Sequence, residues 1–350
     1  MKIIFFPTDH STNRYGAIIT DGLKKRGIIM FPFEKASNNL KLLKHVQILH
    51  LNWYESLGKS TIIDLKRFMG KVFKLGLFKL LRIKIVWTMH NLMPHDQRNI
   101  RLKKYLIGII VRCADKIIIH SKVSRDILNE NYIGVDKKIV YIPHPNYIDS
   151  YGGLNDQFVM TTSKKLELLF LGAIKPYKNI ELLMDVVSEF KNDVVLTIAG
   201  KPESLSYKAS LIRYAENKPN LVLHFNFIPD SEIHKYVREC DLLVFPYDIK
   251  SSLNSGSVIM SFSMGRSVIC PEIGTISDLP NYGQVLVYKY RTNEEHFDQL
   301  KSAITKAVEM KRTDINIFRN MGMALFDYVK KVHDNDKVIN QLIKVYDDLL

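Results

Sequence analysis

Short apolar runs alternate along this chain with longer segments in which apolar residues recur every three or four positions. The short runs are typical of buried β-strands, and the longer segments are typical of amphipathic helices. In the first half the pattern predicts strands at 2–6, 46–50, 83–88, 116–120 and 139–142, with helices near 14–26, 61–81, 100–112 and 124–131. In the second half it predicts strands at 166–171, 194–199, 221–225, 242–245, 267–270 and 285–288, again with helices between them.

Repeated βα alternation in both halves predicts an α/β protein with two parallel sheets, each covered by helices. A chain of 350 residues is too long for one ordinary core and fits two domains of roughly 150 to 200 residues each. From 143 to 165 the periodicity is lost, which is typical of a linker. We therefore expect Rossmann-like, doubly wound domains at 1–150 and 166–313 that face a central cleft. A linker at 151–165 would join them, and C-terminal helices at 314–350 could pack back across the hinge.

Charge is distributed unevenly between the two halves. Residues 1–165 carry 28 Lys and Arg against 12 Asp and Glu, whereas residues 166–350 carry 22 against 24, so the whole net charge of +14 comes from the first half. Such an asymmetry indicates an acidic partner, which is anionic lipid, a phosphorylated substrate or nucleic acid. A merely solvated basic surface is the alternative.

Eight of these cations lie between 59 and 84, where Asp64 is the single acidic residue. A cationic amphipathic helix of this kind would lie on an anionic membrane surface, although a covering helix whose lysines face water has the same pattern. We expect no nucleic-acid partner, because no helix-turn-helix, RNP-like or zinc signature accompanies the charge. The apolar side would be formed by Ile62, Ile63, Phe68, Val72, Phe73, Leu75, Leu77 and Phe78.

Any membrane contact should be peripheral. The first apolar stretch is closed by Pro7 and Asp9, which is too short for a signal peptide. The longest uninterrupted apolar run found in the basic half, 105–111, is far below the ~20 residues of a spanning helix. Cys113, Cys240 and Cys270 show no metal-ligand spacing and indicate small buried side chains in a reducing compartment.

One segment, 245–274, predicts an anion site. An apolar strand end is followed by a polar loop and then by a helix of small residues, so Ser255, Gly256 and Ser257 would lie at a helix N-terminus. Free backbone N–H groups and the helix dipole favour a diphosphate at such a position. The site would therefore belong to the second domain.

A second loop, after the strand at 166–171, has complementary chemistry. Gly172 allows a close turn of the backbone, Lys175 and Lys178 supply ammonium groups, and Asn179 can cap the next helix. Together with the first loop it would hold a diphosphate from two sides. A basic, solvated βα loop without a ligand is the alternative.

Four motifs carry a family resemblance: LFLGAIKPYKNIELL, LTIAGKP, LVLHFNFIPDSEIHKYVRECDLLVFPY and NSGSVIMSFSMGRSVICPEIG. In order and spacing, residues 166–280 resemble the C-terminal domain of GT-B glycosyltransferases of glycosyltransferase family 4. The pieces NRYGAIITDGLKKRG, HLNWYE and VWTMHNLMPH resemble, more faintly, the N-terminal domain of bacterial cell-surface polysaccharide glycosyltransferases.

The resemblance implies hexosyl transfer from a nucleotide diphosphate sugar to a polyprenyl-diphosphate-linked or oligosaccharide acceptor, in bacterial cell-surface polysaccharide biosynthesis. The enzyme would be cytoplasmic and peripheral on the anionic inner face of the plasma membrane, and retention of configuration is expected. No DxD-like pair is found in a convincing place. We therefore expect neither a catalytic metal nor a cofactor.

Site residues follow from the loops after the strands. His90 is the first catalytic candidate, and the family resemblance implies that it faces the donor sugar; a structural histidine is its alternative. His10 or Asp9 could serve as general base if the reaction inverts configuration. The loop after 221–225 and the end of 194–199 would contact the nucleotide through Asn226, Phe227, Ile228 and Lys201. Acceptor contacts are predicted for Asn13, Asn52, Trp53, Asn91 and His95.

This chain departs from the family pattern at three positions. Two glutamates that relatives place near the donor sugar and ribose correspond here to Ser252 and Met260, and Ala173 replaces an arginine. Sugar recognition is therefore less defined than the fold. Two further functions share these features: a GT-B sugar-nucleotide epimerase, which would need acid and base carboxylates, and a non-enzymatic glycan- or membrane-binding module.

Overall fold

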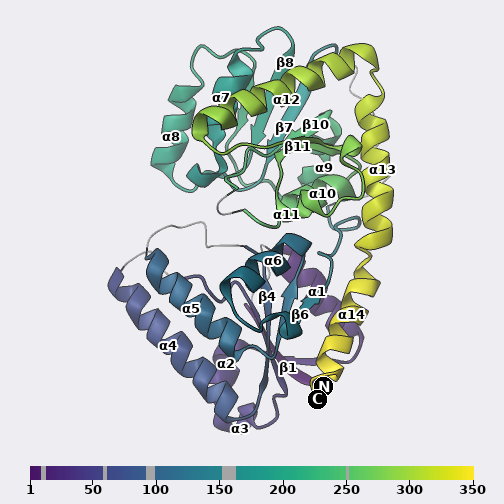
Figure 1. Ribbon diagram of the computed structural model, residues 1–350. Helices are drawn as coiled ribbons and strands as arrows, with labels where there is room; N and C mark the ends of the chain where they lie inside the picture. Colours follow the sequence, from purple (N-terminus) through teal and green to yellow (C-terminus); the bar gives the residue numbers. More distant parts are fainter. Residues whose placement is uncertain (9–12, 58–60, 92–98, 152–162, 250–251) are drawn as a thin grey trace. The chain divides into compact units, whose positions relative to one another are not determined.

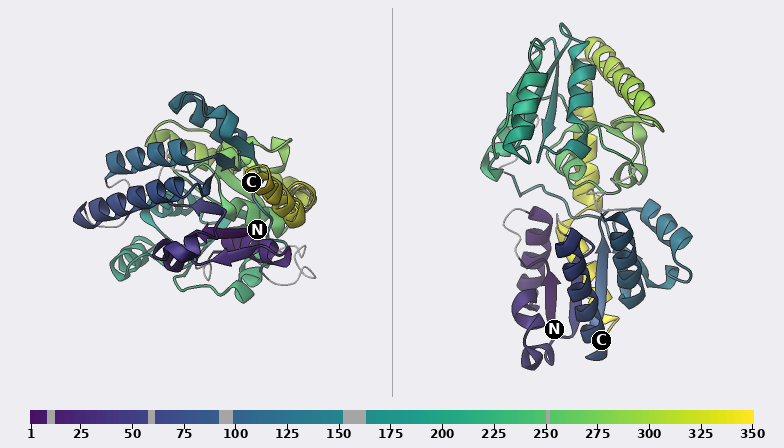
Figure 2. Two further views of the ribbon diagram at one scale, coloured as in Figure 1. Left: turned by 90° about the horizontal axis from the view of Figure 1, so that it is seen from below. Right: turned by 90° about the vertical axis from the view of Figure 1, so that its left-hand side faces the viewer.

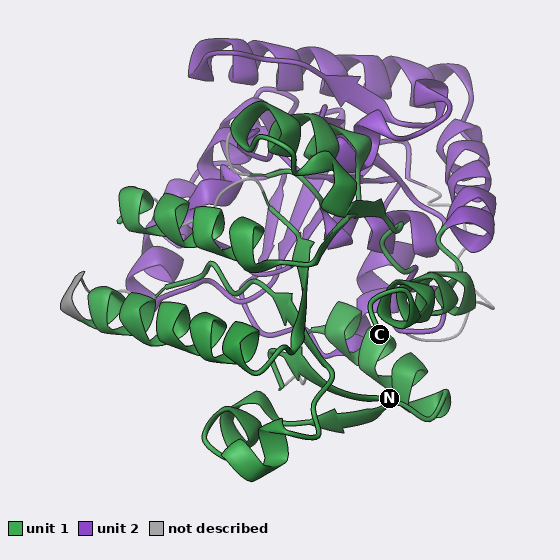
Figure 3. Ribbon diagram, turned by 60° about the horizontal axis from the view of Figure 1, so that its bottom comes forward, with its two compact units in different colours: residues 1–145, 250–254, 333–350 green, residues 146–249, 255–332 purple. Residues whose placement is uncertain are grey.

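The computed structural model describes residues 1–8, 13–57, 61–91, 99–151, 163–249 and 252–350. These residues form two compact units, which are coloured separately in Figure 3. Unit 1 comprises 1–145, 250–254 and 333–350, and unit 2 comprises 146–249 and 255–332. The chain therefore changes unit at 145/146, close to the end of the predicted first domain, and the last helix lies in unit 1 rather than in unit 2.

Unit 1 is built on a parallel sheet in which the described strands follow the order β2-β1-β3-β4-β5-β6 (Figure 1). Consecutive strands run outward from β1 in both directions, so the strand order reverses between β1 and β3. Ligands of such sheets bind at the carboxyl ends of the strands beside this switch point. The strands are β1 (Lys2–Phe6), β2 (Ile29–Phe31), β3 (Ile48–Asn52), β4 (Lys84–Met89), β5 (Lys116–Ile119) and β6 (Ile139–Tyr141).

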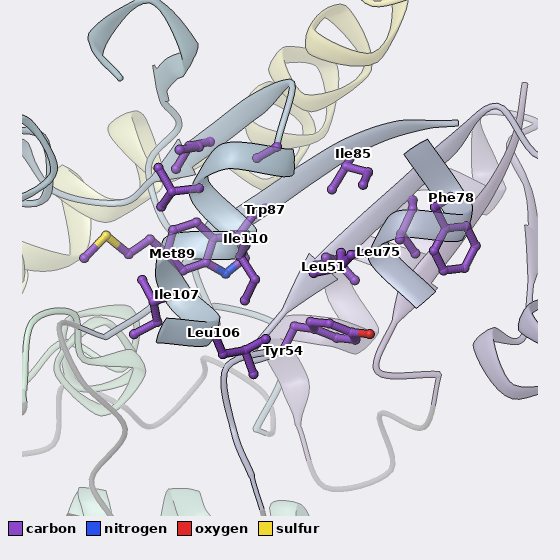
Figure 4. Packing of buried hydrophobic residues seen from close by; sticks show 14 of the residues in the cluster. Leu51, Tyr54, Leu75, Phe78, Ile85, Trp87, Met89, Leu106, Ile107 and Ile110 are labelled. Atoms are coloured by element: carbon purple, nitrogen blue, oxygen red, sulfur yellow. The ribbon is translucent and has the colours of Figure 1, made fainter. Parts of the chain in front are cut away.

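Helices cover both faces of this sheet. One face packs against α2 (Phe33–Ser37), α3 (Leu40–Leu43), α4 (Thr61–Leu80), α5 (Ile100–Cys113) and α6 (Lys122–Asn131). Figure 4 shows the centre of this core, where Trp87 and Tyr54 lie among leucine and isoleucine side chains. Because successive strand residues point to opposite faces, Ile85 and Trp87 enter this core while Val86 enters the other.

The other face is covered by α1 (Arg14–Lys25) and α14 (Asn335–Asp347), although these helices lie at opposite ends of the chain. A Cβ atom on Gly22 would lie 1.8 Å from Ile339 Cδ1, so any larger residue at this position would require the Ile339 side chain to move. Tyr346 Oη is 2.5 Å from His50 Nδ1 inside the same core. The C-terminal residues therefore complete the core of unit 1.

Unit 2 has the strand order β12-β11-β10-β7-β8-β9, again parallel (Figure 2, right). Counted from its own first strand, this is the 3-2-1-4-5-6 order of dinucleotide-binding folds, with the switch point between β7 and β10. The strands are β7 (Leu166–Leu171), β8 (Val194–Ala199), β9 (Leu221–His224), β10 (Leu242–Val244), β11 (Ser267–Pro271) and β12 (Leu286–Tyr288).

Its helices include a long one, α12, that is tied to the sheet by a buried ion pair. Lys311 Nζ lies 2.5 Å from Asp241 Oδ2, with side chains 4% and 8% exposed, and it also donates to the Lys165 carbonyl oxygen. Asp241 Oδ2 accepts from the Glu167 amide as well, so β7, β10 and α12 meet at this pair. The helices are α7 (Ile180–Ser188), α8 (Leu205–Tyr214), α9 (Asp230–Arg238), α10 (Gly256–Ser263), α11 (Gly274–Ser277), α12 (Asn293–Thr313) and α13 (Ile317–Val332).

The α/β class and the two doubly wound sheets predicted from the sequence are confirmed, and the predicted strands are found within two residues of their predicted ends. Three short elements, β2, α2 and α3, were not predicted. They have three to five residues each, which is too short to show a periodicity. The predicted linker, 151–165, falls mostly on residues outside the described ranges.

Replacing Lys311 by Ala should destabilise unit 2 by about 3 kcal/mol, because Asp241 would be left as an uncompensated buried charge. Urea unfolding followed by circular dichroism measures this loss, and hydrogen exchange of the β10 amides assigns it to unit 2. The neighbouring pair Arg312–Asp193 is exposed and provides a matched control, so Arg312→Ala should cost less than about 1 kcal/mol. Equal losses in the two variants would contradict the assigned role of burial.

Candidate active site

In unit 1 the candidate site lies where β1, β3 and β4 end, beside the switch point. Asn52 ends β3 and is fully buried, and its Nδ2 donates to the Phe6 carbonyl oxygen at 3.0 Å. Its Oδ1 lies 3.0 Å from His90 Nε2. Because the amide orientation is fixed by Phe6, Oδ1 must accept and His90 must carry its proton on Nε2. His90 Nδ1 then keeps a lone pair.

Trp53 holds the other side of the His90 ring. The two rings stack with centroids 4.0 Å apart and an angle of 14° between their planes. Trp53 has a φ of 50°, a backbone conformation that costs free energy for a residue with a side chain and is found preferentially at functional sites. The carbonyl oxygen of His90 accepts from Asn254 Nδ2 at 3.2 Å. His90 is therefore held by Asn52 at its ring edge, by Trp53 at its ring face and by Asn254 at its backbone carbonyl group.

Around His90 lies a group of five buried histidines that we call the histidine cluster. The Tyr15 ring is at its centre, with centroids 4.8 Å from His90, 5.5 Å from His120 and 5.0 Å from His144. His333 Nδ1 donates to the His144 carbonyl oxygen at 2.6 Å. The members of the cluster are His50, His90, His120, His144 and His333.

The whole cluster is electrically neutral at physiological pH. Burial lowers the pKa of every member, to about 4 for His333 despite its hydrogen bond to the His144 carbonyl oxygen. At His50 and His120, where the pKa falls to about 3 and about 4, burial is joined by the charge of a neighbouring histidine. The pKa values of His90 and His144 also lie well below 6.5 for the same two reasons. His90 can therefore donate or accept a hydrogen bond but supplies no positive charge.

The predicted acceptor residues have different environments. Asn13 caps α1, since its side chain accepts from the Gly16 amide, while Asn52 is enclosed by its two partners. Trp53 and Asn91 are half-buried at the strand ends. Of the other predicted residues, Asp9, His10 and His95 lie outside the described residues. The structure thus brings Asn52, Trp53 and His90 together, and gives Asn52 a positioning role instead of an exposed one.

In unit 2 the candidate site lies at the ends of β7 and β10, on either side of the switch point. Gly172 and Gly200 follow β7 and β8 with φ values of 132° and 150°. A Cβ atom on Gly200 would lie 1.9 Å from the Gly172 carbonyl oxygen, so only glycine fits there. On Gly172 it would lie 3.6 Å from Lys178 Nζ, which places this ammonium group beside the bend.

Lys178 is a cation held in a partly enclosed position. Its Nζ lies 5.5 Å from the centre of the Phe170 ring, and burial, followed by the nearby charge of Lys175, lowers its pKa to about 8. Lys175 is half-buried on the same loop, with its Nζ 5.9 Å from the Tyr177 ring centre. An incoming anion would stabilise both charges, and it would relieve the repulsion between them.

The N-terminus of α10 provides the second half of this edge. Ser255 caps the helix, because its Oγ accepts from the Val258 amide, and it also contacts Tyr247 Oη at 2.9 Å. The Ser255 amide donates to Thr275 Oγ1. The amides of Gly256 and Ser257 are the next donors of the helix, and no acceptor for them is found within the described ranges. Of the three predicted residues, Gly256 and Ser257 thus have backbone amides available for an anion, whereas the amide of Ser255 is bonded to Thr275.

The remaining predicted contacts lie on the β8 and β9 loops. Lys201, Asn226 and Phe227 are exposed, and Ile228 is half-buried. Met260 is buried in α10 and Ser252 is half-buried, so the two positions at which the family carries glutamates hold no carboxylate in the structure either.

Tyr15, His120, Tyr247 and Gly200 were not predicted as site residues. Gly200 follows the motif strand at 194–199, so a glycine directly after a predicted strand was the available signal. Tyr15 and His120 carry no local signal, since their importance comes from a contact between residues far apart in the chain. Tyr247 lies within the segment 245–274 and contacts Ser255 eight residues further on, but its residue type alone did not indicate this role. In the part of the chain that the structure describes, no three His, Cys, Asp or Glu side chains are grouped to hold a metal ion.

Comparison with known proteins finds a family model that matches part of this chain. Residues 165–309 match the family model described as Glycosyl transferases group 1. A GDP-mannose:glycolipid 4-beta-D-mannosyltransferase of Xanthomonas campestris pv. campestris is 26% identical over 262 residues, which cover 71% of this chain and 68% of that protein. A second protein of that name from the same pathovar is 26% identical over 241 residues, covering 66% of this chain and 62% of its own length.

Solved structures share the fold over nearly the whole chain. HepE of Anabaena, in complex with UDP and glucose, has a TM-score of 0.72 at 12% identity, and the match covers 99% of each chain. A glycosyltransferase of Rickettsia africae has a TM-score of 0.63 at 14% identity and covers 99% of this chain and 98% of its own.

The histidine cluster should make the stability of unit 1 sensitive to acid. Each histidine has a lower pKa in the folded protein than the 6.5 of an unfolded chain, so the unfolded state binds more protons below pH 6.5. Stability should therefore be full above pH 6.5 and fall towards pH 4, by about 2 kcal/mol at pH 5 for each histidine that stays neutral. Urea unfolding measured at a series of pH values gives this slope.

Two variants separate the cluster from other acid effects. His120→Asn should reduce the pH slope by about one proton, whereas His45→Asn, at an exposed position of the same unit, should leave it unchanged. A free energy of unfolding that stays constant between pH 7 and pH 5 would show that the cluster is not neutral.

Proposed function

We propose a specific reaction for this chain, which is a glycosyltransferase of the GT-B fold: transfer of a hexose from a nucleotide diphosphate sugar to a lipid-linked or growing glycan acceptor. The fold and the glycosyltransferase activity predicted from the sequence motifs are confirmed by the group 1 match and by the shared architecture. The observation that carries the finer proposal is the pair of anion-binding loops at the unit 2 switch point, Gly172 to Lys178 and Ser255 to Ser257.

Leaving-group stabilisation is the main task that we assign to unit 2. Cleavage of the bond between the anomeric carbon and the diphosphate oxygen moves negative charge onto the leaving nucleotide diphosphate. Donors that are already oriented towards that charge lower the barrier most effectively. We assign this role to the ammonium groups of Lys175 and Lys178 and to the amides of Gly256 and Ser257. With cations supplied by the protein, we propose that the reaction needs no metal ion.

In unit 1 we propose that His90 contacts the donor sugar or the acceptor as a neutral hydrogen-bonding group. Asn52 fixes its tautomer and Trp53 fixes its plane, so the ring reaches the reaction without an entropic cost of orientation. Asn91 at the same strand end, and Asn13 and His95 from the sequence, are the proposed acceptor contacts. Lys201, Asn226, Phe227 and Ile228 are the proposed contacts of the nucleotide.

GDP-mannose is the donor that we propose, because it is named for both curated relatives. Their names also specify a β-linked product. From an α-linked nucleotide sugar this requires inversion, so we propose inversion in place of the retention that the family resemblance implied. The absence of carboxylates at Ser252 and Met260 agrees with this choice. Inversion needs a base for the acceptor hydroxyl, and Asp9 or His10 after β1 is our candidate.

Membrane association is proposed through α4, with the acceptor presented at the cytoplasmic face of the plasma membrane. Within the described residues, no helix is both long and apolar enough to cross a membrane. Leu65, Met69, Phe73 and Leu80 lie along one side of α4 with exposed fractions of 54%, 59%, 73% and 80%. Exposed apolar residues in a row indicate an interaction surface.

This exposed row differs from the apolar face predicted from the sequence. Leu75 and Phe78 of the predicted face are buried in the core of unit 1, and Phe68, Val72 and Leu77 pack against that core. Lys71 also points inward, where its Nζ donates to the carbonyl oxygens of Tyr54 and Ser56. The helix is thus both a covering helix and an exposed apolar surface, and its outer residues support the membrane proposal.

Lys178→Ala should lower the turnover number by about a hundredfold, because one donor that stabilises the leaving diphosphate is lost. The measurement is transfer from GDP-mannose to a glycolipid acceptor, with thermal-shift binding of GDP-, UDP- and dTDP-sugars to identify the donor. Lys191→Ala removes an exposed lysine of unit 2 and serves as the control. Transfer that is unaffected by Lys178→Ala would exclude the phosphate role.

The configuration of the product tests the stereochemical proposal. We expect a β-linked mannoside from GDP-α-mannose, assigned by the one-bond carbon–hydrogen coupling at the anomeric centre in NMR. In Asp9→Asn or in His10→Ala, whichever removes the base, transfer should fall by about a hundredfold while donor binding is retained. An α-linked product would establish retention and remove the need for a base.

A further inference from the structure

A face of α5 that points away from the core has an unusual composition. Leu106, Ile107, Ile110 and Val111 of this helix are buried in the core of unit 1. On the other side Arg101, Lys104, Tyr105, Ile109 and Arg112 follow each other at helical spacing. This outer face therefore combines three cations with apolar and aromatic side chains.

The same face lines a pocket of about 630 Å³, which is completed by Asn131 and Tyr132 at the end of α6. We call it the α5–α6 pocket. Gly108 lies in its α5 wall, and a Cβ atom at this position would meet nothing closer than Tyr132 Cε1 at 3.9 Å. The missing side chain of Gly108 thus keeps part of the pocket open.

Charge in the α5–α6 pocket is unbalanced. Arg101, Lys104 and Arg112 contribute to its lining, whereas no Asp or Glu does. Among the described residues, none of the three cations has an ion-pair partner. Three like charges around one pocket repel each other, and an anion bound between them removes that repulsion. The pocket therefore suits a phosphate group, which arginine binds through two hydrogen bonds.

Apolar side chains surround this charged pocket. Tyr105 is 71% exposed, and Ile133, which follows Tyr132, is fully exposed. Next to α5 lies α4 (Figure 1), whose outer side carries the exposed row from Leu65 to Leu80. If the phosphate of a phospholipid were bound here, the acyl chains of that lipid would lie beside an apolar protein surface. This combination is the one that a phospholipid requires.

Position along the helices distinguishes a membrane lipid from the reacting acceptor. α5 begins after the end of β4, where His90 lies, and its last turn, with Arg112, leads to the start of β5 at the opposite edge of the sheet. A helix of this length spans about 20 Å. Asn131 likewise ends α6 far from the strand ends. Arg101 lies in the first turn of α5, and Arg112 lies about 16 Å further along the helix. The Arg112 end of the pocket is therefore remote from the catalytic edge of unit 1.

We propose that the Arg112 end of the α5–α6 pocket binds the phosphate headgroup of an anionic bilayer phospholipid, with Arg112 as its main ligand and with Lys104 and Arg101 as further cations along the same face. The inference rests on the proposed peripheral association with a membrane. It adds a defined lipid site to the apolar surface of α4, and it assigns the acceptor's diphosphate to a different place.

Vesicle binding with two kinds of variant tests this site. Gly108→Leu fills the pocket without a change in charge, and it replaces glycine within a helix by a better helix former, so the fold is retained. The triple variant Arg101→Gln, Lys104→Gln, Arg112→Gln removes the charges. A matched triple variant, Lys25→Gln, Lys35→Gln, Lys44→Gln, removes three exposed charges elsewhere in unit 1.

Cosedimentation of the full chain with vesicles of phosphatidylcholine, with and without phosphatidylglycerol, is the measurement. We expect the binding constant for phosphatidylglycerol vesicles to fall about a hundredfold in the pocket triple variant and at least about tenfold in Gly108→Leu. The matched triple variant should lose less than about threefold. An equal loss in both triple variants, or full binding by Gly108→Leu, would show diffuse surface charge instead of a pocket.

Two further measurements show whether the pocket binds a lipid or free phosphate, and whether lipid binding is independent of donor binding. Excess inorganic phosphate should not displace the protein from vesicles, and displacement would identify free phosphate as the ligand. Thermal-shift binding of the donor should be unchanged in Gly108→Leu. If Gly108→Leu loses vesicle binding but still binds the donor, the lipid pocket is supported even when no transfer is observed. If the wild-type protein binds vesicles but transfers no sugar, only the proposed function is contradicted.

Discussion

Parallel strand direction is the constraint on which the rest of this structure depends. In a parallel sheet all strands end at one edge, so loops that are far apart in sequence meet there without further adjustment. In unit 2 this brings the bend at Gly172 and the helix start at Gly256 to the two sides of the β7–β10 switch point. In unit 1 it brings Asn52 next to His90. The topology of the two sheets therefore decides which residues meet at the candidate sites.

The two edges differ in their electrostatics for a physical reason. Burial favours the neutral form of a histidine, because the charged form loses its hydration. The histidine cluster follows this rule, and the low pKa values of its members leave His90 as an uncharged donor or acceptor. Lys178 is less enclosed, and a pKa of about 8 leaves it mostly charged at pH 7. A neutral edge and a cationic edge match the two needs of glycosyl transfer, which are a hydroxyl that is oriented and a diphosphate that is stabilised.

Unit 1 also shows how one helix can serve two environments. α4 buries Leu75 and Phe78 against the sheet and exposes Met69 and Phe73 on the opposite side. A helix that is apolar on both sides is explained neither by a core alone nor by a membrane alone. The basic pocket between α5 and α6 adds a charged feature beside this exposed apolar surface.

The sequence by itself determined the α/β class, the strands, the glycosyltransferase motifs and the loops with Gly172, Lys178 and Gly256, because each of these depends on local periodicity or on residues adjacent in the chain. Only the tertiary structure decided that Asn52 positions His90 and that Tyr346 from the last helix completes the core around His50. Those contacts join residues whose spacing carries no period. The pKa values of the buried histidines likewise depend on which distant side chains exclude water, and that follows from packing in three dimensions.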